Sequence, residues 1–516
     1  MSIESKRAPR GSLAELIALT IDRSSDVPIF RQIYLGLREA IIGGRLKAES
    51  RLMSTRALAD ELSVSRNSVT QAYEQLTAEG YICGRSGSGT FVADVSIDLL
   101  QPTRARGVEQ TFAPPDDLSK LGKIAEHWWP SLPLGGRQPF NPGVCSLDAN
   151  SLQSLRRLAQ RHLLALGESH SSYSHPQGLP QLREQIAIYL RAARAVRCDA
   201  ENIIVVSGAQ QAVDLALKVL VDSGDHVWLE DPCYSTTRAA VESVGGRIFP
   251  VPVDSDGIDV GFGVANCRTA RLSFVTPSHQ YPLGVTLSLQ RRLELLRWAR
   301  ENNAWIIEDD FDSEIRYEGR PLASLQGLDE ASRVIYIGTF SKMLMPGLRV
   351  GFAVVPTRLM PAFLAARFLA DRQPPMFQQL LMADFLAEGH LTSHLSRMRR
   401  VYREARDQLC KTIDRHLGDH IEILPTVQGT QLFAHLRDKR INDVEFCRRA
   451  ADVGVALKPI SPMCIKRTDA HGLLLAFAGF SQTEINLAVS RLATLLNSRE
   501  TFASAKLNTS RIGSPH

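Results

Sequence analysis

A lysine in the second half of the chain has neighbours that suit an anionic aldehyde. Lys342 lies in the run GTFSKMLMPGLRVG, residues 338–351, with Thr339 three positions before it and Arg349 seven positions after it. A lysine amine condenses with an aldehyde to form a Schiff base, while hydroxyls and a guanidinium bind a phosphate. The run therefore indicates a site for a small aldehyde that carries a phosphate.

Further loops contain residue types that such a site would need, and each follows an apolar stretch that predicts a buried strand. Residues 207–211, SGAQQ, are small and polar and open a predicted helix, whose free backbone amides favour a phosphate. Tyr234 offers a ring that could stack on a planar cofactor, and Asp309 offers a carboxylate for a protonated ring nitrogen. Taken singly, a surface tyrosine or an acidic strand end explains these residues equally well.

The apolar stretches that precede these loops alternate with helical patterns, such as residues 288–302, and predict an α/β fold with a mostly parallel sheet. The predicted strands are residues 203–206, 227–229, 247–251, 272–275, 305–307 and 334–337. Another loop, residues 276–284, follows the fourth of these strands. Ligands of open α/β sheets collect beyond the carboxyl ends of the strands, so we expect the loops to meet at one edge.

The first part of the chain, residues 27–95, has a different pattern of short helices followed by a glycine-rich hairpin. Ser54 and Ser65 suit the N-caps of a second and a third helix, with a tight turn between these helices. The glycines of the loop 84–89 suit a hairpin that closes the unit. Helix, turn, helix and wing form a DNA-reading arrangement. A small helical protein-interaction domain is the alternative that the pattern alone leaves open.

If this unit reads DNA, the third helix enters the major groove. Arg66 and Asn67 then meet base edges, and Arg56 meets a phosphate. The sequence itself resembles the winged helix-turn-helix of the GntR family, in VPIFRQIYLGLREAIIGGRL (27–46) and STRALADELSVSRNSVTQAYEQLTAEGYICGRSGSGTFV (54–92). The resemblance implies double-stranded operator DNA as a partner. The unit's own charge is only slightly positive, so we expect tight binding to need two copies on a two-fold site. The expected DNA-binding residues are Arg56, Ser65, Arg66, Asn67, Thr70, Ser88 and Gly89.

Composition and length bound the rest of the chain. Its 516 residues are enough for more than one domain, and the net charge of +5 indicates no particular partner. The eight cysteines are scattered singly without zinc-ligand spacing, which predicts no metal site and fits a reducing cytoplasm. No apolar stretch is long enough to span a membrane, and no signal peptide is predicted.

Four regions are expected along the chain. Residues 27–95 form the reader, and residues 96–137 form a polar, proline-containing linker in which 118–129 has a helical pattern. Residues 138–500 form the α/β domain, and residues 501–516 form a disordered tail.

The α/β region resembles the fold-type I aminotransferase domain that binds pyridoxal 5′-phosphate (PLP). The motifs SGAQQAVDLAL, TPSHQYPLG, EDDFDSEIRY and GTFSKMLMPGLRVG carry this resemblance, which extends over residues 138–495 and is strongest to the MocR/GabR-type regulators. It implies that Lys342 forms the Schiff base, that Asp309 pairs with the pyridine nitrogen and that Tyr234 stacks on the ring. The remaining implied contacts are Tyr281 near the ring's 3-oxygen and a phosphate site made of Ala209, Gln210, Thr339, Ser341 and Arg349.

Two of the chain's departures from the aminotransferase pattern bear on turnover. Phe311 stands where the family usually has a tyrosine that hydrogen-bonds the 3-oxygen. Residues 472–481, GLLLAFAGFS, lack the arginine that usually clamps a substrate carboxylate. Both departures argue against sustained turnover of ordinary amino acids. The effector stays open among an amine, a small amino acid and a vitamin B6 compound such as PLP itself.

These features together predict a PLP-dependent transcriptional regulator that senses a small amine-bearing effector or a B6 vitamer. The family resemblance further implies a domain-swapped, head-to-tail homodimer in which each reader packs on the partner's large domain. One alternative is an active aminotransferase with an appended DNA-binding domain. Another is a DNA-binding protein whose large domain is a PLP-free scaffold for dimerisation.

Overall fold

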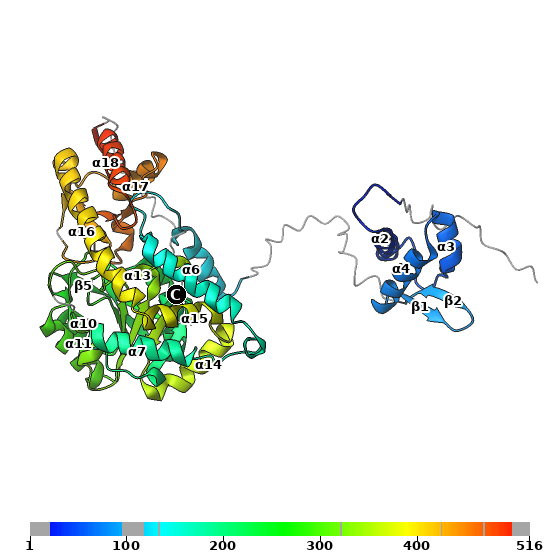
Figure 1. The fold of residues 1–516 in the computed structure, drawn as a ribbon, viewed down its shortest axis with the longest axis horizontal. Helices are drawn as coiled ribbons and strands as arrows, with labels where there is room; N and C mark the ends of the chain where they lie inside the picture. The colour runs from blue at the N-terminus through cyan, green and yellow to red at the C-terminus, as the bar shows by residue number, and fades with distance from the viewer. Residues whose placement is uncertain are drawn as a thin grey trace, which may run out of the picture. The chain divides into compact units, whose positions relative to one another are not determined.

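The computed structural model describes residues 21–94, 118–132, 135–319, 322–424, 426–467 and 470–497. The chain divides into two units, one within residues 1–115 and the other within residues 116–516 (Figure 1). The predicted tail, residues 501–516, lies outside the described residues, as does most of the predicted linker.

The described part of the smaller unit contains three helices and a two-stranded antiparallel hairpin. Its elements are α2 (Ile29–Ile42), α3 (Thr55–Leu62), α4 (Arg66–Ala78), β1 (Ile82–Arg85) and β2 (Gly89–Val92). Apolar side chains at helical spacing form its core, among them Ile33, Leu37, Ile41, Leu58, Val69 and Leu76.

Local capping sets the helix starts in this unit, as the sequence predicts. The hydroxyl of Ser54 accepts a hydrogen bond from the Ala57 amide at 3.2 Å, and that of Ser65 accepts from the Ser68 amide at 3.1 Å. Ser63 ends α3 in the left-handed region with φ 53°, which turns the chain into α4 within a few residues.

The larger unit is built on an eight-stranded sheet. In order across the sheet, the strands are β3 (Ile203–Val206), β10 (Gly351–Val354), β9 (Val334–Thr339), β8 (Trp305–Asp310), β7 (Leu272–Val275), β4 (His226–Asp231), β5 (Arg247–Asp254) and β6 (Gly257–Ile258). All run parallel except β10 and the short edge strand β6. The predicted strands are confirmed. Strand β10 was not predicted, because it is short and follows the lysine run directly.

Helices cover both faces of this sheet (Figure 1). They are α6 (Ala149–Leu164), α7 (Pro180–Arg194), α8 (Ala209–Leu220), α9 (Ser235–Ser243), α10 (Val260–Cys267), α11 (Leu289–Glu301), α12 (Leu325–Leu328), α13 (Phe340–Met343), α14 (Met360–Asp371) and α15 (Met376–Ala387). Alternate residues of β9 face opposite cores: Ile335 and Ile337 pack with α8, α9 and α14, while Val334 and Tyr336 pack on the other side. Burial on both faces explains the continuous apolar runs of the strands.

The C-terminal part of the larger unit has a second, antiparallel sheet in the order β11 (Ile421–Ile423), β12 (Gln431–Leu436), β14 (Gly472–Ala476) and β13 (Lys458–Pro459). Three helices accompany it, α16 (His390–Leu417), α17 (Asp443–Asp452) and α18 (Gln482–Asn497). One face of this sheet shares a core with α6, α7, α15 and α16, which joins the two sheets. No helix in the described ranges has both the length and the apolar character needed to cross a membrane.

A helix that precedes the α/β region also packs on the larger unit. Helix α5 (Lys120–Trp128) lies where the sequence has a helical pattern, and it contacts α9. The indole N–H of Trp128 donates to the carboxylate of Glu242 at 2.8 Å, and the Arg238 guanidinium lies 5.1 Å from the centre of a Trp128 ring. A helix within the predicted linker is therefore attached to α9, which begins directly after Tyr234.

Candidate functional site

Lys342 lies in α13, the short helix that begins directly after β9. The hydroxyl of Thr339 caps this helix by accepting from the Ser341 amide at 3.2 Å, so the lysine emerges beyond the carboxyl end of the strand. A Cβ built on Gly143 would lie 3.6 Å from the lysine Nζ. The thiol of Cys145 donates to the Lys342 carbonyl at 3.5 Å. A segment far away in sequence therefore covers the lysine.

Asp309 lies on the neighbouring strand, β8, and offers an unsatisfied acceptor. Its Oδ1 is buried and has no hydrogen-bond partner among the described residues. Burial raises the pKa of Asp309 to about 7, and nearby carboxylates such as Asp310 add to the rise, while Lys342 opposes it. An acceptor of this kind suits a cationic N–H donor, because such a donor would restore the charged form of the carboxyl.

Three aromatic rings meet beside this carboxylate. The ring centres of Tyr234 and Tyr281 are 5.2 Å apart, and those of Tyr281 and Phe311 are 6.1 Å apart, both edge to face. Burial raises the pKa of Tyr234, and the charge of Asp309 adds to this rise, which places the phenol near that carboxylate. The sequence-predicted residues Tyr234, Tyr281 and Asp309 are thus brought together.

The loop before α8 and the turn after α13 form a cradle for an anion. Gly208 precedes α8 with φ 100°, and Arg349 donates to the carbonyl of Ser207. A Cβ on Gly208 would lie 2.9 Å from the Arg349 guanidinium, so only glycine fits this approach. The hydroxyl oxygen of Ser341 is buried without a partner in the described part of the chain.

Ala209 and Gln210 are the first two residues of α8. The side chain of Gln210 is exposed, so its contribution to an anion site is through the backbone amide. The helix start supplies amides and the positive end of the helix dipole.

These residues fit PLP. Oδ1 of Asp309 and the hydroxyl of Ser341 are buried polar atoms that find no partner within the described ranges, and a ring N–H and a phosphate would satisfy them. When bound, PLP supplies an aldehyde that condenses with primary amines and a ring that accepts electrons. The chain supplies the Lys342 amine for the aldehyde and the Asp309 carboxylate to hold a proton at the ring nitrogen. Tyr234 is available to stack on the ring.

Two carboxylates that the sequence reasoning did not assign hold the site's loops in place. Glu230 accepts from the Thr276 hydroxyl at 2.7 Å and from the Gln280 side chain at 3.3 Å, which fixes the loop of Tyr281. Burial raises the pKa of Glu230 to about 7. Asp231 accepts from three backbone amides, those of Ile465, Lys466 and Arg467, at 2.8, 2.8 and 2.9 Å. Their only sequence signal was their place at the end of a strand.

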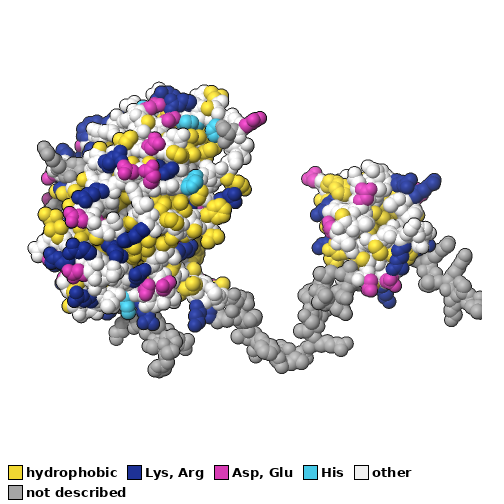
Figure 2. Space-filling view, turned by 90° about the horizontal axis from the view of Figure 1, so that it is seen from below, with side chains coloured by type: hydrophobic (Ala, Val, Ile, Leu, Met, Phe, Trp, Pro, Cys, Tyr) yellow, Lys and Arg dark blue, Asp and Glu magenta, His cyan; other side chains and the backbone are white. Residues whose placement is uncertain are grey.

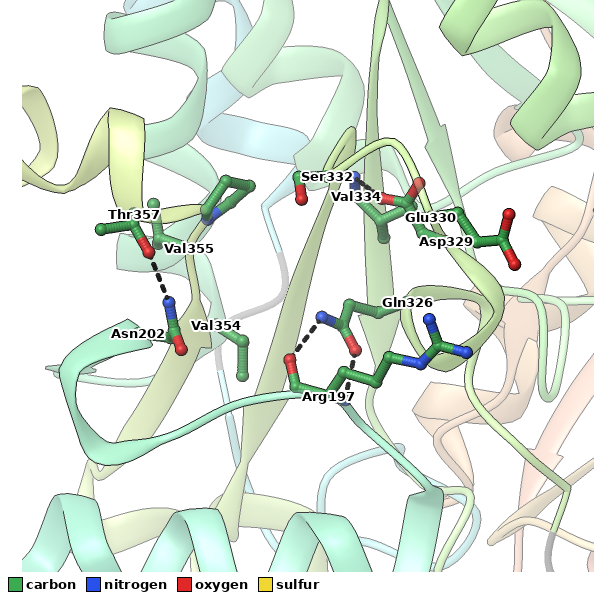
Figure 3. Close-up of a pocket in the computed structure, with 11 residues that line it drawn as sticks. Arg197, Asn202, Gln326, Asp329, Glu330, Ser332, Val334, Val354, Val355 and Thr357 are labelled. Carbon is green, nitrogen blue, oxygen red and sulfur yellow. Dashed lines mark hydrogen bonds between the residues drawn. The ribbon is translucent and has the colours of Figure 1, made fainter.

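A separate cavity lies at the opposite edge of the main sheet. It has a volume of about 470 Å³ and is lined by residues that include the first residue of β9, Val334 (Figure 3). Several polar groups that line it form hydrogen bonds with one another (Figure 3). Asn202 donates to the Thr357 hydroxyl at 3.1 Å, and the Gln326 side chain both accepts from and donates to the backbone of Arg197. These groups already have partners, so the cavity is not the site that the loops of Lys342 form.

The predicted DNA-reading residues of the smaller unit gather at the start of its helices. Arg66 and Asn67 are exposed in the first turn of α4. The Arg66 Nε lies 3.5 Å from the Thr55 hydroxyl at the start of α3, where Arg56 is also exposed. Thr70 donates to the Arg66 carbonyl at 2.9 Å, so its hydroxyl already has a local partner. The Ser65 hydroxyl caps α4 by accepting from the Ser68 amide. It also forms a hydrogen bond of 2.8 Å with the Ser68 hydroxyl.

The hairpin of the smaller unit exposes Ser88 and Gly89. Gly89 has φ 110°, and a Cβ there would lie 3.0 Å from the Nε of Arg51. Arg51 therefore adds a cation beside the hairpin that sequence reasoning did not identify, since it lies in the connection between α2 and α3. Arg85, also on the hairpin, is paired with Glu49 at 2.7 Å. Lys and Arg side chains are visible at several points on this unit (Figure 2).

Comparison with known proteins matches both units. Residues 30–92 match the bacterial regulatory proteins of the gntR family, and residues 139–492 match aminotransferase class I and II. The probable rhizopine catabolism regulatory protein MocR of Rhizobium meliloti is 38% identical over 490 residues, which cover 95% of this chain and 98% of MocR. The chain belongs to the MocR/GabR-type transcriptional regulators.

Other members and relatives agree with this assignment. The pyridoxine biosynthesis regulator PdxR of Corynebacterium glutamicum is 34% identical over 81% of this chain and 83% of its own length. The solved structure of LysN, an alpha-aminoadipate aminotransferase from Thermus thermophilus, superposes with a TM-score of 0.63 at 29% identity. The matched region covers 72% of this chain and 94% of LysN. This MocR-type chain therefore combines a GntR-family DNA-binding unit with a fold-type I aminotransferase unit, as the sequence predicts.

Proposed function

We propose that this MocR-type regulator holds PLP at Lys342 and uses it to sense a small effector. The observation that carries the proposal is a pair of buried polar atoms without hydrogen-bond partners among the described residues, namely Oδ1 of Asp309 and the hydroxyl of Ser341, the residue before Lys342. An aminotransferase fold goes with PLP chemistry, and LysN was solved with a phosphopyridoxyl compound of leucine. Sensing rather than turnover fits Phe311 and the lack of an arginine in 472–481.

The cofactor part is tested by reconstituting the purified full-length protein with excess PLP. We expect an absorbance band near the visible edge that borohydride fixes to the protein and that Lys342→Ala abolishes. Lys466→Ala is the matched control, because its amine lies 5.9 Å from the centre of the Phe249 ring and serves another contact. A protein without such a band, or a band that survives Lys342→Ala, contradicts the proposal and favours a PLP-free scaffold.

We also propose how the smaller unit reads its operator. Arg66 and Asn67 contact base edges, whereas Arg56 and the hairpin residues Ser88 and Gly89 contact phosphates. Arg66→Ala should cost about 1–3 kcal/mol at the operator and relax its sequence preference. Arg56→Ala should weaken all DNA sequences about equally and reduce the dependence of affinity on salt. Identical effects of the two changes on specificity would contradict these assignments.

We further propose that the regulator acts as a homodimer. Large apolar side chains are exposed at the end of α6, in the loop after it and at the end of α14, and these are Leu163, Leu164, Leu166, Tyr173, Phe368 and Leu369. The Arg372 guanidinium lies 3.7 Å from the centre of the Tyr173 ring and 5.1 Å from that of Phe368, so the loop and α14 are adjacent. Figure 2 shows hydrophobic side chains gathered on one side of the larger unit. Contiguous exposed apolar surface is typical of an interface.

Signals from the cofactor site have a physical route toward the linker. Tyr234 is the residue before the first turn of α9, and Arg238 and Glu242 of the same helix hold Trp128 of α5. A ligand that shifts Tyr234 would therefore act on the helix at the linker's end, and only a difference in its affinity for two states can drive such a shift. Because a regulator works on chromosomal DNA, the proposal includes a cytoplasmic location.

An active aminotransferase with an appended DNA-binding domain is the rival function. The similarity to LysN over the length of that enzyme is the observation in its favour. Sustained conversion of an amino acid with a 2-oxo acid by the purified protein, abolished by Lys342→Ala, would support the rival. Binding without turnover would support the sensor.

A further inference from the structure

We propose that Arg51 is the cation with which the hairpin of the smaller unit binds a backbone phosphate of DNA, and that Glu49 keeps the neighbouring cation, Arg85, out of that contact. This inference rests on the proposed operator binding of the smaller unit and adds one phosphate contact and one attenuating residue to it. Two guanidinium groups on one face of a small sheet carry the inference, because only one of them is free of a carboxylate in the described part of the chain.

The segment before α3 extends the hairpin of β1 and β2 by a third extended stretch. The Leu52 amide donates to the Thr90 carbonyl at 2.8 Å, and Arg51 forms an antiparallel bridge with Phe91 of β2. Leu52 is 4% exposed and belongs to the core of the unit. Because side chains alternate along an extended segment, Arg51 lies on the outer face, where Phe91 is its direct neighbour.

Gly89 leaves room for the Arg51 guanidinium near the end of the hairpin. Gly89 precedes Phe91 by two residues and pairs with Arg85, so all three positions share the outer face. A Cβ at Gly89 would lie 3.0 Å from Nε of Arg51 and 3.3 Å from one of its terminal nitrogens. Arg51 is exposed, and no carboxylate of the described residues lies within ion-pair distance of it. Its charge is therefore available beside the exposed residues Ser88 and Gly89.

Arg85 lies on the same face but is already paired. Its terminal nitrogen donates to the Glu49 carboxylate at 2.7 Å, and its guanidinium lies 4.8 Å from the centre of the Phe91 ring. The two charged side chains are 50% and 62% exposed, so the pair itself adds little to stability. The pair matters for binding, since Arg85 would have to give up both contacts to reach a phosphate. Glu49 would then stand unpaired beside the DNA backbone, whose negative charge repels it.

Arg51 also lies close in sequence to the predicted phosphate contact of α3. The segment that contains it leads into the first turn of α3, where Arg56 is exposed. The Tyr73 hydroxyl of α4 fixes this segment by donating to the Met53 carbonyl at 2.9 Å. Arg51 therefore lies on a segment that joins the hairpin to the helix starts, and both of these contain predicted DNA contacts. A guanidinium suits a phosphate, and such a contact is independent of the base sequence.

The test uses the full-length protein and a labelled DNA duplex of mixed sequence, because a phosphate contact acts on any sequence. Affinity is measured by fluorescence anisotropy over a series of salt concentrations. We expect Arg51→Ala to make the slope of log affinity against log salt shallower by about 0.9 for each bound reader, which corresponds to about eightfold weaker binding at about 0.1 M salt. Arg51→Lys keeps the charge and should retain most of the slope.

Two further variants test the role of Glu49. Arg85→Ala is the matched control, with the same charge change on the same sheet face, and should leave the slope nearly unchanged because Arg85 binds no phosphate. Glu49→Gln should steepen the slope and tighten binding by releasing Arg85, and adding Arg85→Ala should abolish this change in slope.

The outcomes separate the possible failures. An unchanged slope for Arg51→Ala, or equal losses for Arg51→Ala and Arg85→Ala, overturns the assignment of Arg51. A slope that Glu49→Gln leaves unchanged overturns the role of Glu49. If Arg51→Ala does not fold, Arg51→Gln decides the first point in its place, because it also removes the charge. No binding of the duplex by the unaltered protein at low salt would instead overturn the proposed function, so the two failures are distinguishable.

Discussion

The adjacent carboxylates Asp309 and Asp310 should respond in opposite directions when each is changed to asparagine. Asp310 accepts from the Arg194 Nε at 2.8 Å and from the Tyr336 hydroxyl at 2.6 Å, both buried. Oδ1 of Asp309 has no partner among the described residues. We therefore expect Asp309→Asn to stabilise the cofactor-free larger unit at alkaline pH and Asp310→Asn to destabilise it.

The size of the first effect follows from the pKa of Asp309. A rise from 3.8 to about 7 is about three units, or about 4 kcal/mol at 1.36 kcal/mol per unit. We take half of this, about 2 kcal/mol, because the side chain as a whole is partly exposed and solvent screens its charge. The matching loss for Asp310→Asn is about 3–5 kcal/mol, since it leaves the buried Arg194 without its carboxylate.

The pH dependence has a defined sign. Between about pH 4 and pH 7 native Asp309 holds a proton that the unfolded chain releases, so its contribution to the free energy of unfolding falls as pH rises. Asparagine does not ionise. The gain from Asp309→Asn should therefore be small near pH 4.5, grow through about pH 7 and be constant above that.

Urea unfolding followed by tryptophan fluorescence measures these differences. All five tryptophans lie in the larger unit, from Trp128 to Trp305, so the signal reports that unit. A difference between Asp309→Asn and the unaltered protein that is constant from pH 4.5 to pH 8.5 would refute the reasoning. Asp309→Asn should also weaken PLP binding by at least about tenfold, because the ring N–H loses its anionic partner.

Three more predictions concern other parts of the molecule. Gly208→Ala should weaken PLP binding and cost about 1–3 kcal/mol of stability, because its Cβ would meet the Arg349 guanidinium at 2.9 Å and φ is 100°; an unchanged PLP titration would contradict the cradle. Trp128→Ala should keep the cofactor band but reduce the change in operator affinity that an effector causes, measured by DNA titration with and without effector; full coupling would exclude α5 from the route. Leu369→Lys should shift the regulator toward monomer in sedimentation, because Leu369 is 84% exposed on the proposed interface, and an unchanged dimer would place the interface elsewhere.

Much of the fold was predictable because its signals are local. Ser54 and Ser65 cap helices through hydrogen bonds to amides three residues away, so their types and positions were sufficient. The strands around Lys342 and Asp309 were evident from continuous apolar runs, and the rule that ligands collect beyond parallel strands brought their loops together. Strand β10 was missed because it is short and follows the lysine run directly, and its antiparallel place between β3 and β9 is set by partners distant in sequence.

The sequence by itself determined which groups reach the site's edge, namely the amine of Lys342, the carboxylate of Asp309 and the ring of Tyr234. Only the tertiary structure decided what each group meets there. Oδ2 of Asp310 obtains Arg194, while Oδ1 of its neighbour Asp309 obtains no partner in the part of the chain that the structure describes. Leu474 and Tyr281 pack in one hydrophobic cluster, although they are nearly 200 positions apart. Periodicity and capping act over a few residues, whereas pairing and burial are set by long-range packing, which no local pattern encodes.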